Sequence, residues 1–275
     1  KWMKDNRSTV EGMLQAIFQG GDQVKSNPQA LARAARVSSE VYKETGAGPD
    51  YWEKYFKGTL ERDQTGVMVD LGGSSVNNLS DTLLALGLVP GSSNLVATTY
   101  KVFGDVAKAQ YPDLMPSYPP IDQVLDTSYV QDVAGRAAPT TAAEKPKFSP
   151  SAPVERVVSR RSWNITFDTG KATFTPSAQA DLERLLRDLL VASATVVEVH
   201  GHTDNSGSPQ ANMALSEARA FAVKQWLEQR SPVNFPEGRI RVFSHGQENP
   251  IVPNSSAENK ARNRRVEIVL GTAGT

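Results

Sequence analysis

Residues 200–220, HGHTDNSGSPQANMALSEARA, place two of the chain's three histidines close to an acid and an arginine. His200 and His202 are two residues apart, so on a strand they share one face. Asp204 follows them, and Arg219 lies in the next stretch, which has helical spacing. These residue types allow two kinds of chemistry. The imidazoles could begin a metal site, or the carboxylate and the guanidinium could recognise a charged ligand.

The metal hypothesis starts from the order His-x-His-x-Asp, with which metallo-β-lactamase-like hydrolases begin a zinc site. That pattern continues with a histidine, whereas this chain has Asn205. His245 is the one remaining imidazole, so a complete catalytic site would use every histidine of the chain. A metal-dependent hydrolase at His200, His202 and Asp204 is therefore kept as the alternative prediction. We favour imidazoles that are hydrogen-bonded at a strand end, with no metal, no cofactor and no enzymatic activity.

Strands and helices alternate around this segment. Apolar residues at every second position predict strands, and leucines at helical spacing predict helices. The predicted strands are residues 160–168, 195–203, 238–246 and 264–270, and the predicted helices are residues 175–193 and 208–230. This order predicts an α+β domain in which helices pack on one face of a mixed four-stranded sheet.

The motifs of this half carry a family resemblance. VHGHTDNSGSPQANMALSEARAFAVKQWL, followed by SHGQENPIVPNSSAENKARNRRVEIVL, resembles the C-terminal peptidoglycan-binding family of outer-membrane protein A. Peptidoglycan-associated lipoprotein and flagellar motor stator proteins contain the same kind of domain. The resemblance covers about residues 155–270 and includes the strand ITFDTGKATF. It implies an anchor that binds peptidoglycan non-covalently, through the diaminopimelate of the stem peptide.

Such a ligand suits the residue chemistry. Diaminopimelate ends in an ammonium beside a carboxylate, so the resemblance implies that Asp204 receives the ammonium and Arg219 grips the carboxylate with its two-pronged guanidinium. Each residue taken alone also fits a structural role, an Asx turn for Asp204 and a surface charge or a salt bridge to Asp204 for Arg219. The further polar contacts that the resemblance implies are Thr203, Asn212, Arg264, Asp168 and Thr169.

The first 134 residues are predicted to be mostly helical, with Asn27 capping a helix that has Pro28 at its first position. SNPQALARAA, YWEKYF and VFGDVAKAQYP resemble the later part of a type 2 periplasmic solute-binding domain of the nitrate, taurine and sulfonate kind. The resemblance implies a partial α/β domain with a small solute as its ligand. Much of the first lobe of such a domain would lie upstream of Lys1, and the start without methionine indicates a processed or truncated chain.

The predicted domain bounds follow from composition. Residues 135–156 are rich in Ala, Pro, Thr and Ser and are predicted to be a linker between residues 1–134 and residues 157–275. A length of 275 residues fits two domains of ordinary size.

Charge and residue usage exclude several function classes. The formal net charge is zero, which argues against nucleic acid as a partner. Cysteine is absent, so disulfides and thiol catalysis are excluded. No apolar run is long enough to predict a transmembrane segment. These observations and the family resemblance together predict a periplasmic protein that is associated with the cell wall. Attachment to the outer membrane is left open.

Overall fold

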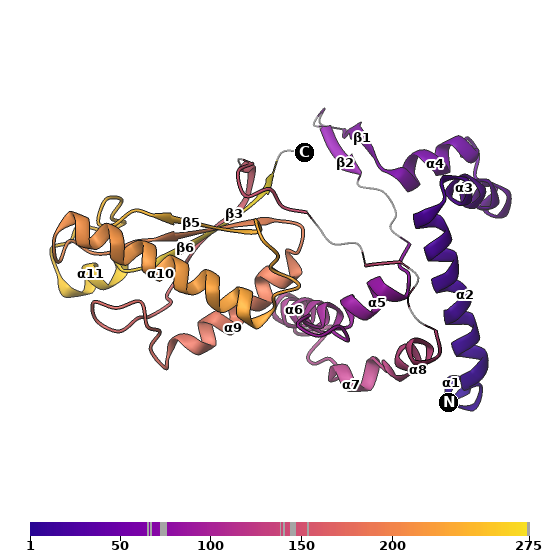
Figure 1. The fold of residues 1–275 in the computed structure, drawn as a ribbon, viewed down its shortest axis with the longest axis horizontal. Coiled ribbons are helices and arrows are strands. Elements are labelled where there is room, and N and C mark those ends of the chain that lie inside the picture. The colour runs from indigo at the N-terminus through magenta and orange to yellow at the C-terminus, as the bar shows by residue number, and fades with distance from the viewer. Residues whose placement is uncertain are drawn as a thin grey trace. The chain divides into compact units, whose positions relative to one another are not determined.

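The computed structural model describes residues 1–275 apart from residues 65, 67, 72–75, 138, 140, 144–146, 153 and 274–275. The chain forms two compact units (Figure 1). One unit consists of Lys1–Leu84 with Asp122–Glu144, and the other of Ala85–Ile121 with Lys145–Thr275. The predicted linker lies partly outside the described residues.

The second unit contains a four-stranded sheet in the order β3-β6-β4-β5. Its strands are β3 (Val154–Trp163), β4 (Val196–Gly201), β5 (Ile240–Ser244) and β6 (Val266–Ala273). β6 pairs antiparallel with β3 and β4, whereas β4 and β5 are parallel. The prediction of an α+β domain with a mixed four-stranded sheet is therefore confirmed.

The first strand of this sheet differs from its prediction. We expected residues 160–168 to be one strand, but β3 ends at Trp163. Beyond it the chain forms a separate hairpin, in which Phe167 bridges Phe174 and Asp168 donates its N–H to the carbonyl of Thr173. The alternation of apolar residues continues across the break, so sequence alone could not locate it.

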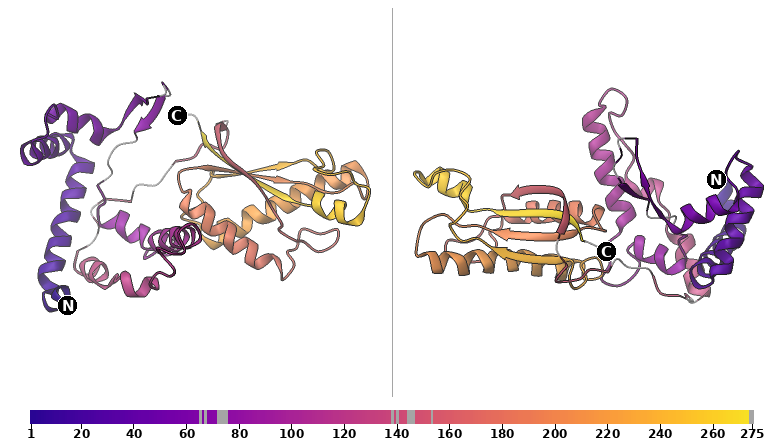
Figure 2. Two further views of the ribbon diagram at one scale, coloured as in Figure 1. Left: turned by 180° about the vertical axis from the view of Figure 1, so that it is seen from behind. Right: turned by 90° about the horizontal axis from the view of Figure 1, so that it is seen from above.

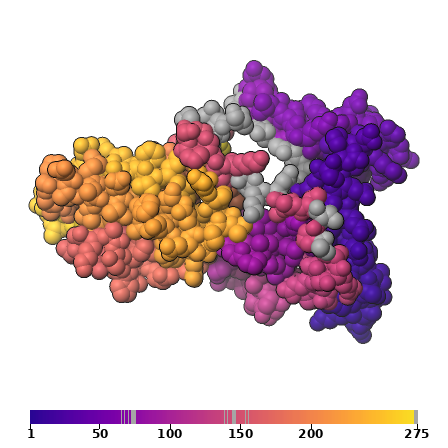
Figure 3. All heavy atoms as spheres, viewed as in Figure 1, coloured from indigo at the N-terminus to yellow at the C-terminus, as the bar shows by residue number. Residues whose placement is uncertain are grey.

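Two helices cover one face of the sheet (Figures 1 and 2). α9 (Ala178–Val191) buries the five leucines whose helical spacing predicted it, namely Leu182, Leu185, Leu186, Leu189 and Leu190. α10 (Pro209–Arg230) begins where the Ser208 hydroxyl accepts the N–H of Ala211, with proline at the first helical position. A short helix, α11 (Ala257–Asn263), precedes β6. The space-filling view shows one face of this packed unit (Figure 3).

The buried side chain of Arg239 caps the C-terminal end of α9. Its side chain is fully buried, and its guanidinium donates to four carbonyl oxygens, those of Leu189, Ala192, Thr195 and Asn234, at 2.6–3.2 Å. Two of these carbonyls belong to the end of α9, where no intrahelical donor remains for them. A cation is also favoured there by the helix dipole.

The sheet domain also holds an upstream helix. α6 (Leu95–Gln110) packs on α9, and the turn before it bonds to the loop after α10. Ser93 donates its N–H to the Asn234 side chain at 2.9 Å, and Val233 donates to the carbonyl of Gly91 at 3.3 Å. Residues 85–121 thus group with the sheet, whereas composition predicts that they belong to the domain of residues 1–134. The bounds 1–134, 135–156 and 157–275 stay a prediction.

The first unit is mostly helical among its described residues. Asn27 caps α3 by accepting the N–H of Gln29 at 2.9 Å, as its sequence predicted. The described strands of this unit form one antiparallel pair. No helix in the described ranges is long and apolar enough to cross a membrane. The elements are α1 (Trp2–Asp5), α2 (Arg7–Ser26), α3 (Pro28–Tyr42), α4 (Pro49–Lys57), β1 (Thr59–Arg62), β2 (Met68–Leu71), α5 (Leu79–Ala85), α7 (Ile121–Val124) and α8 (Ser128–Arg136).

Candidate ligand-binding site

The loop that carries Asp204 leaves β4 close to α10. A Cβ on Gly201 would lie 2.1 Å from the carbonyl oxygen of Ser216, so only glycine allows strand and helix this approach. His202 and Thr203 then continue the backbone pairing by donating to the carbonyls of Arg265 and Gly246. These bonds fix the loop between the ends of β5 and β6.

Asp204 is 6% exposed and has two partners. Its Oδ1 accepts the N–H of Ser206 at 2.8 Å, which is the Asx turn weighed above, and its Oδ2 accepts from Nη1 of Arg264 at 2.6 Å. Burial alone would raise the pKa of this carboxyl, but the hydrogen bonds from Arg264 and Ser206 outweigh it, and the pKa is lowered. Asp204 is therefore a charged, pre-oriented acceptor at neutral pH.

Arg219 reaches the same region from α10 and is also 6% exposed. Its Nε donates to the carbonyl of Lys171 at 3.0 Å, and its guanidinium lies 5.1 Å from the ring centroid of Phe167. Burial, followed by the charge of Arg264, lowers the pKa of Arg219. Within the part of the chain that the structure describes, neither Nη atom has a hydrogen-bond acceptor, so the fork is open to a ligand.

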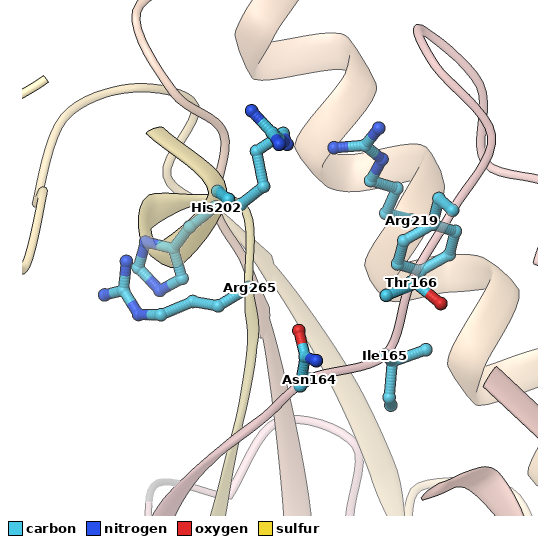
Figure 4. Close-up of a pocket in the computed structure, with 9 residues that line it drawn as sticks. Asn164, Ile165, Thr166, His202, Arg219 and Arg265 are labelled. Atoms are coloured by element: carbon cyan, nitrogen blue, oxygen red, sulfur yellow. The ribbon is translucent and has the colours of Figure 1, made fainter. Parts of the chain in front are cut away.

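Arg219 and Arg264 line a common cavity of about 310 Å³. In Figure 4, Arg219 lies on one side, His202 and Arg265 lie on the other, and Asn164 and Ile165 lie below. The remaining walls are Thr166, Phe167 and Ala261. Three guanidiniums, those of Arg219, Arg264 and Arg265, line this half-enclosed space, and such groups suit a carboxylate, which accepts paired N–H bonds.

The other predicted residues divide into two groups. Asn212 lies under the loop, where its Nδ2 donates to the carbonyl of Asp204 at 3.2 Å and to the Gln247 side chain at 2.8 Å. Thr203 is buried beside it, with no partner for its hydroxyl among the described residues. Asp168 and Thr169 lie in the 167–174 hairpin and are not among the residues that line the cavity. That hairpin nevertheless supplies the Lys171 carbonyl that holds Arg219.

Comparison with known proteins shows a family resemblance in this unit. Residues 166–264 match the model of the OmpA family. The C-terminal domain is OmpA-like.

Its relatives include two proteins named as lipoproteins. The chain is 41% identical over 107 residues to the probable lipoprotein YiaD of Escherichia coli (strain K12), covering 39% of this chain and 48% of that relative. It is 33% identical over 111 residues to the peptidoglycan-associated lipoprotein of Rhizobium meliloti (strain 1021), covering 40% and 61%. A solved structure, the cell wall anchor of the T6SS from Pseudomonas aeruginosa, is 31% identical with a TM-score of 0.36, covering 44% of this chain and 87% of that chain. The chain thus spans less than two thirds of the length of both curated relatives.

The histidines of the OmpA-like domain form a stack on the sheet. His200 lies between Phe243 and His245, and His202 lies on the far side of His245, with ring centroids 4.7–5.1 Å apart and rings tilted by 11–13°. His200 Nδ1 and His245 Nε2 share a hydrogen bond at 2.8 Å. Burial and the nearby Arg265 lower the pKa of His202 to about 3, so its ring is neutral.

The predicted metal ligands His200, His202 and Asp204 do not converge on a common point. Asp204 pairs with Arg264 instead of approaching the imidazoles. Across the described ranges, no group of three His, Cys, Asp or Glu side chains is placed to hold a metal ion. The specific observation that would favour a hydrolase, convergence of His200, His202 and Asp204, is missing from this part of the structure.

Sequence reasoning did not assign the cavity walls of the OmpA-like domain. Phe167 was included only as one residue of an alternating strand, yet it supports Arg219. Arg265 falls within the predicted strand 264–270, yet it lies beside His202 in the wall. β6 begins only at Val266, so Arg265 lies at the edge of the sheet where the loops meet.

Proposed function

We propose that the OmpA-like domain binds peptidoglycan non-covalently and anchors the rest of the chain to the cell wall. The observation that carries this proposal is the open fork of Arg219, which shares a cavity with the Asp204-bound Arg264. The name of one relative, a peptidoglycan-associated lipoprotein, supports the same function. The function is binding, with no catalytic step.

The ligand group in this proposal is the free end of diaminopimelate. Its carboxylate would accept two N–H bonds from the Nη atoms of Arg219, which keep no protein acceptor among the described residues. Its ammonium would approach the Asp204 carboxylate, which is already ionised and held by Ser206 and Arg264. Asn212 would not contact the ligand itself. It positions the loop that carries Asp204 by donating a hydrogen bond to the Asp204 carbonyl. Thr203, Asp168 and Thr169 remain proposed polar contacts.

Sedimentation of the whole chain with insoluble peptidoglycan tests the proposal. Peptidoglycan that contains diaminopimelate should pellet the protein, whereas peptidoglycan with lysine at that position lacks the second carboxylate and should pellet much less. Arg219→Lys and Asp204→Asn should each weaken binding by about tenfold or more, because each removes a charge-assisted contact. Arg184→Lys, on an exposed part of α9, is the matched control. Equal binding to both polymers would refute recognition of diaminopimelate.

For the location of the protein, we propose the periplasm in association with the cell wall, with attachment to the outer membrane. The similarity to two lipoproteins supports this location. Fractionation of cells that express the protein tests it. Release from the outer-membrane fraction by peptidoglycan digestion alone would indicate cell-wall association without a membrane anchor.

For the N-terminal unit we propose a partial solute-binding-like domain with a small solute as its ligand. Its helical order and the capped helix at Pro28 support this assignment. A melting-temperature screen with nitrate, taurine and other small sulfonates tests it. An increase with one of these solutes supports the proposal, and a screen without any increase contradicts it.

A further inference from the structure

A second cavity adjoins the first in the OmpA-like domain. It has a volume of about 430 Å³ and shares four lining residues with the first, Asn164, Ala261, Arg264 and Arg265. Arg265 appears in Figure 4 on the side of the first cavity opposite Arg219. A ligand that fills the first cavity and extends past Asn164 therefore enters the second.

The second cavity has an excess of positive charge. Arg262, Arg264 and Arg265 line it, and Glu258 is the one carboxylate among its lining residues. Arg264 is paired with Asp204, whereas Arg262 has no ion-pair partner within the described ranges. Two guanidiniums are therefore balanced by a single carboxylate at this site.

Arg265 gives a second, independent indication of a ligand. It is 8% exposed, and its one described hydrogen bond runs from Nη2 to the carbonyl of Asn249 at 3.3 Å. Its Nε and Nη1 have no partner among the described residues. Glu267 interacts electrostatically with this guanidinium but forms no ion pair with it among the described residues. A buried guanidinium with unsatisfied N–H groups is costly, and an anion bound close to it lowers that cost.

The uncharged part of the cavity wall contains the polar residues Ser162 and Asn164 and three apolar residues. Trp163, Ile251 and Ala261 contribute to its walls. The exposed Arg161 stacks on the indole of Trp163, with its guanidinium carbon 4.5 Å from the ring centroid. The expected ligand group is thus a carboxylate on a short aliphatic stem, because such a group satisfies the arginines and covers the apolar wall.

We propose that this second cavity binds the α-carboxylate of the D-glutamate that precedes diaminopimelate in the stem peptide. The proposal rests on the proposed function, because diaminopimelate in the first cavity brings its neighbour to the second. D-Glutamate is linked through its γ-carboxyl, so its α-carboxylate stays free and sits on a short aliphatic stem. The stem peptide offers one other carboxylate nearby, at the terminal D-alanine, and the experiment separates the two.

Calorimetric titration of the whole chain with synthetic tetrapeptides provides the test. The reference ligand is L-Ala-γ-D-Glu-diaminopimelate-D-Ala, the second carries D-isoglutamine in place of D-glutamate, and the third ends in D-alaninamide. The parent protein should bind the D-isoglutamine peptide about tenfold more weakly than the reference, because a charge-assisted contact is lost. The D-alaninamide peptide should bind like the reference.

Arg262→Gln tests the protein side of this contact. Arg262 is exposed at the end of α11, so the variant should fold normally, and its preference for the reference over the D-isoglutamine peptide should shrink to about threefold or less. Arg184→Gln removes the same charge from α9, outside both cavities, and should keep the tenfold preference.

The failures are distinguishable. If the parent binds none of the three peptides, the proposed function is wrong, and this inference is wrong with it. If the parent binds the reference and the D-isoglutamine peptide equally well, recognition of diaminopimelate stands and the second site is refuted. A loss confined to the D-alaninamide peptide would refute the assignment to D-glutamate.

Discussion

Arg264 Nη1 donates to Asp204 Oδ2 at 2.6 Å, between a residue just before β6 and a residue just after β4. The sequence alone allows a salt bridge between Asp204 and Arg219 as the structural role of Arg219. Because Arg264 takes that position, Arg219 keeps both Nη atoms free of acceptors among the described residues. The Asp204–Arg264 pair thus leaves Arg219 free to bind a ligand carboxylate. Arg264 meanwhile orients the Asp204 carboxylate, which would meet the ligand ammonium.

Removing Arg264 should change the titration of Asp204. A carboxyl with a lowered pKa stabilises the folded state above its unfolded pKa, and this contribution is lost as the pH falls through the folded pKa. Arg264→Gln removes a hydrogen bond that lowers the pKa of Asp204, so the pKa should rise and the loss should begin at a higher pH. Carbon-13 NMR of the Asp204 carboxyl measures this pKa. Arg262→Gln is the control, and an unchanged pKa in Arg264→Gln would show that the ion pair is absent in solution.

Phe167 should contribute to ligand binding, and replacing it should leave the sheet folded. Its ring lies 5.1 Å from the Arg219 guanidinium, and it also packs on Phe174. Phe167→Leu keeps an apolar side chain but removes the cation–π contact, so affinity for diaminopimelate peptides should fall about threefold to fivefold. Phe174→Leu is the matched control, because it changes the same ring pair at the residue that has no cation–π contact with Arg219 among the described residues. An equal loss in both variants would indicate damage to the hairpin instead of loss of the cation–π contact.

His202 should make the domain sensitive to acid. The pKa of His202 is lowered from 6.5 to about 3, first by burial and then by the charge of Arg265. Between pH 6.5 and pH 3, His202 is therefore protonated in the unfolded chain and neutral in the folded chain. Stability is therefore full above about pH 6.5 and falls as the pH drops toward 3, by up to about 1.4 kcal/mol per pH unit. Urea denaturation at several pH values measures the slope. His202→Gln and His202→Phe should both flatten it, and a slope that only one of them flattens would point to packing instead of titration.

Arg239 should be a major determinant of stability. Arg239→Met leaves one buried and three partly buried carbonyls without their donor, including two at the end of α9, and should cost about 3 kcal/mol or more. Arg230→Met, at an exposed position with one bond to Glu183, should cost about 0.5 kcal/mol or less. Denaturation can be followed by tryptophan fluorescence in a Trp2→Phe, Trp52→Phe background, which leaves Trp163 and Trp226 in the OmpA-like domain. A similar cost for both variants would mean that the carbonyls find water in place of Arg239.

Local features of the fold were predictable from the sequence. The leucines of α9, the Asn27 cap and the strands β4, β5 and β6 depend on residues within one element, so periodicity and capping chemistry predicted them. The end of β3 at Trp163 was not predictable, because the apolar alternation runs on into the 167–174 hairpin. The packing of α6 on α9 was also missed, since it depends on contacts between segments about 80 residues apart along the chain.

The sequence by itself determined the α+β class of the C-terminal domain and the residue types of its candidate site, because both follow from local patterns and motifs. Only the tertiary structure decided which of those residues meet. The antiparallel register of β4 and β6 sets Gly201 opposite Val266, which brings Asp204 to Arg264 at the same end of the sheet. The parallel register of β4 and β5 sets His200 opposite Phe243, which places His202 beside His245. Strand register is fixed by the packing of whole strands against the core, and that information is not contained in any single segment.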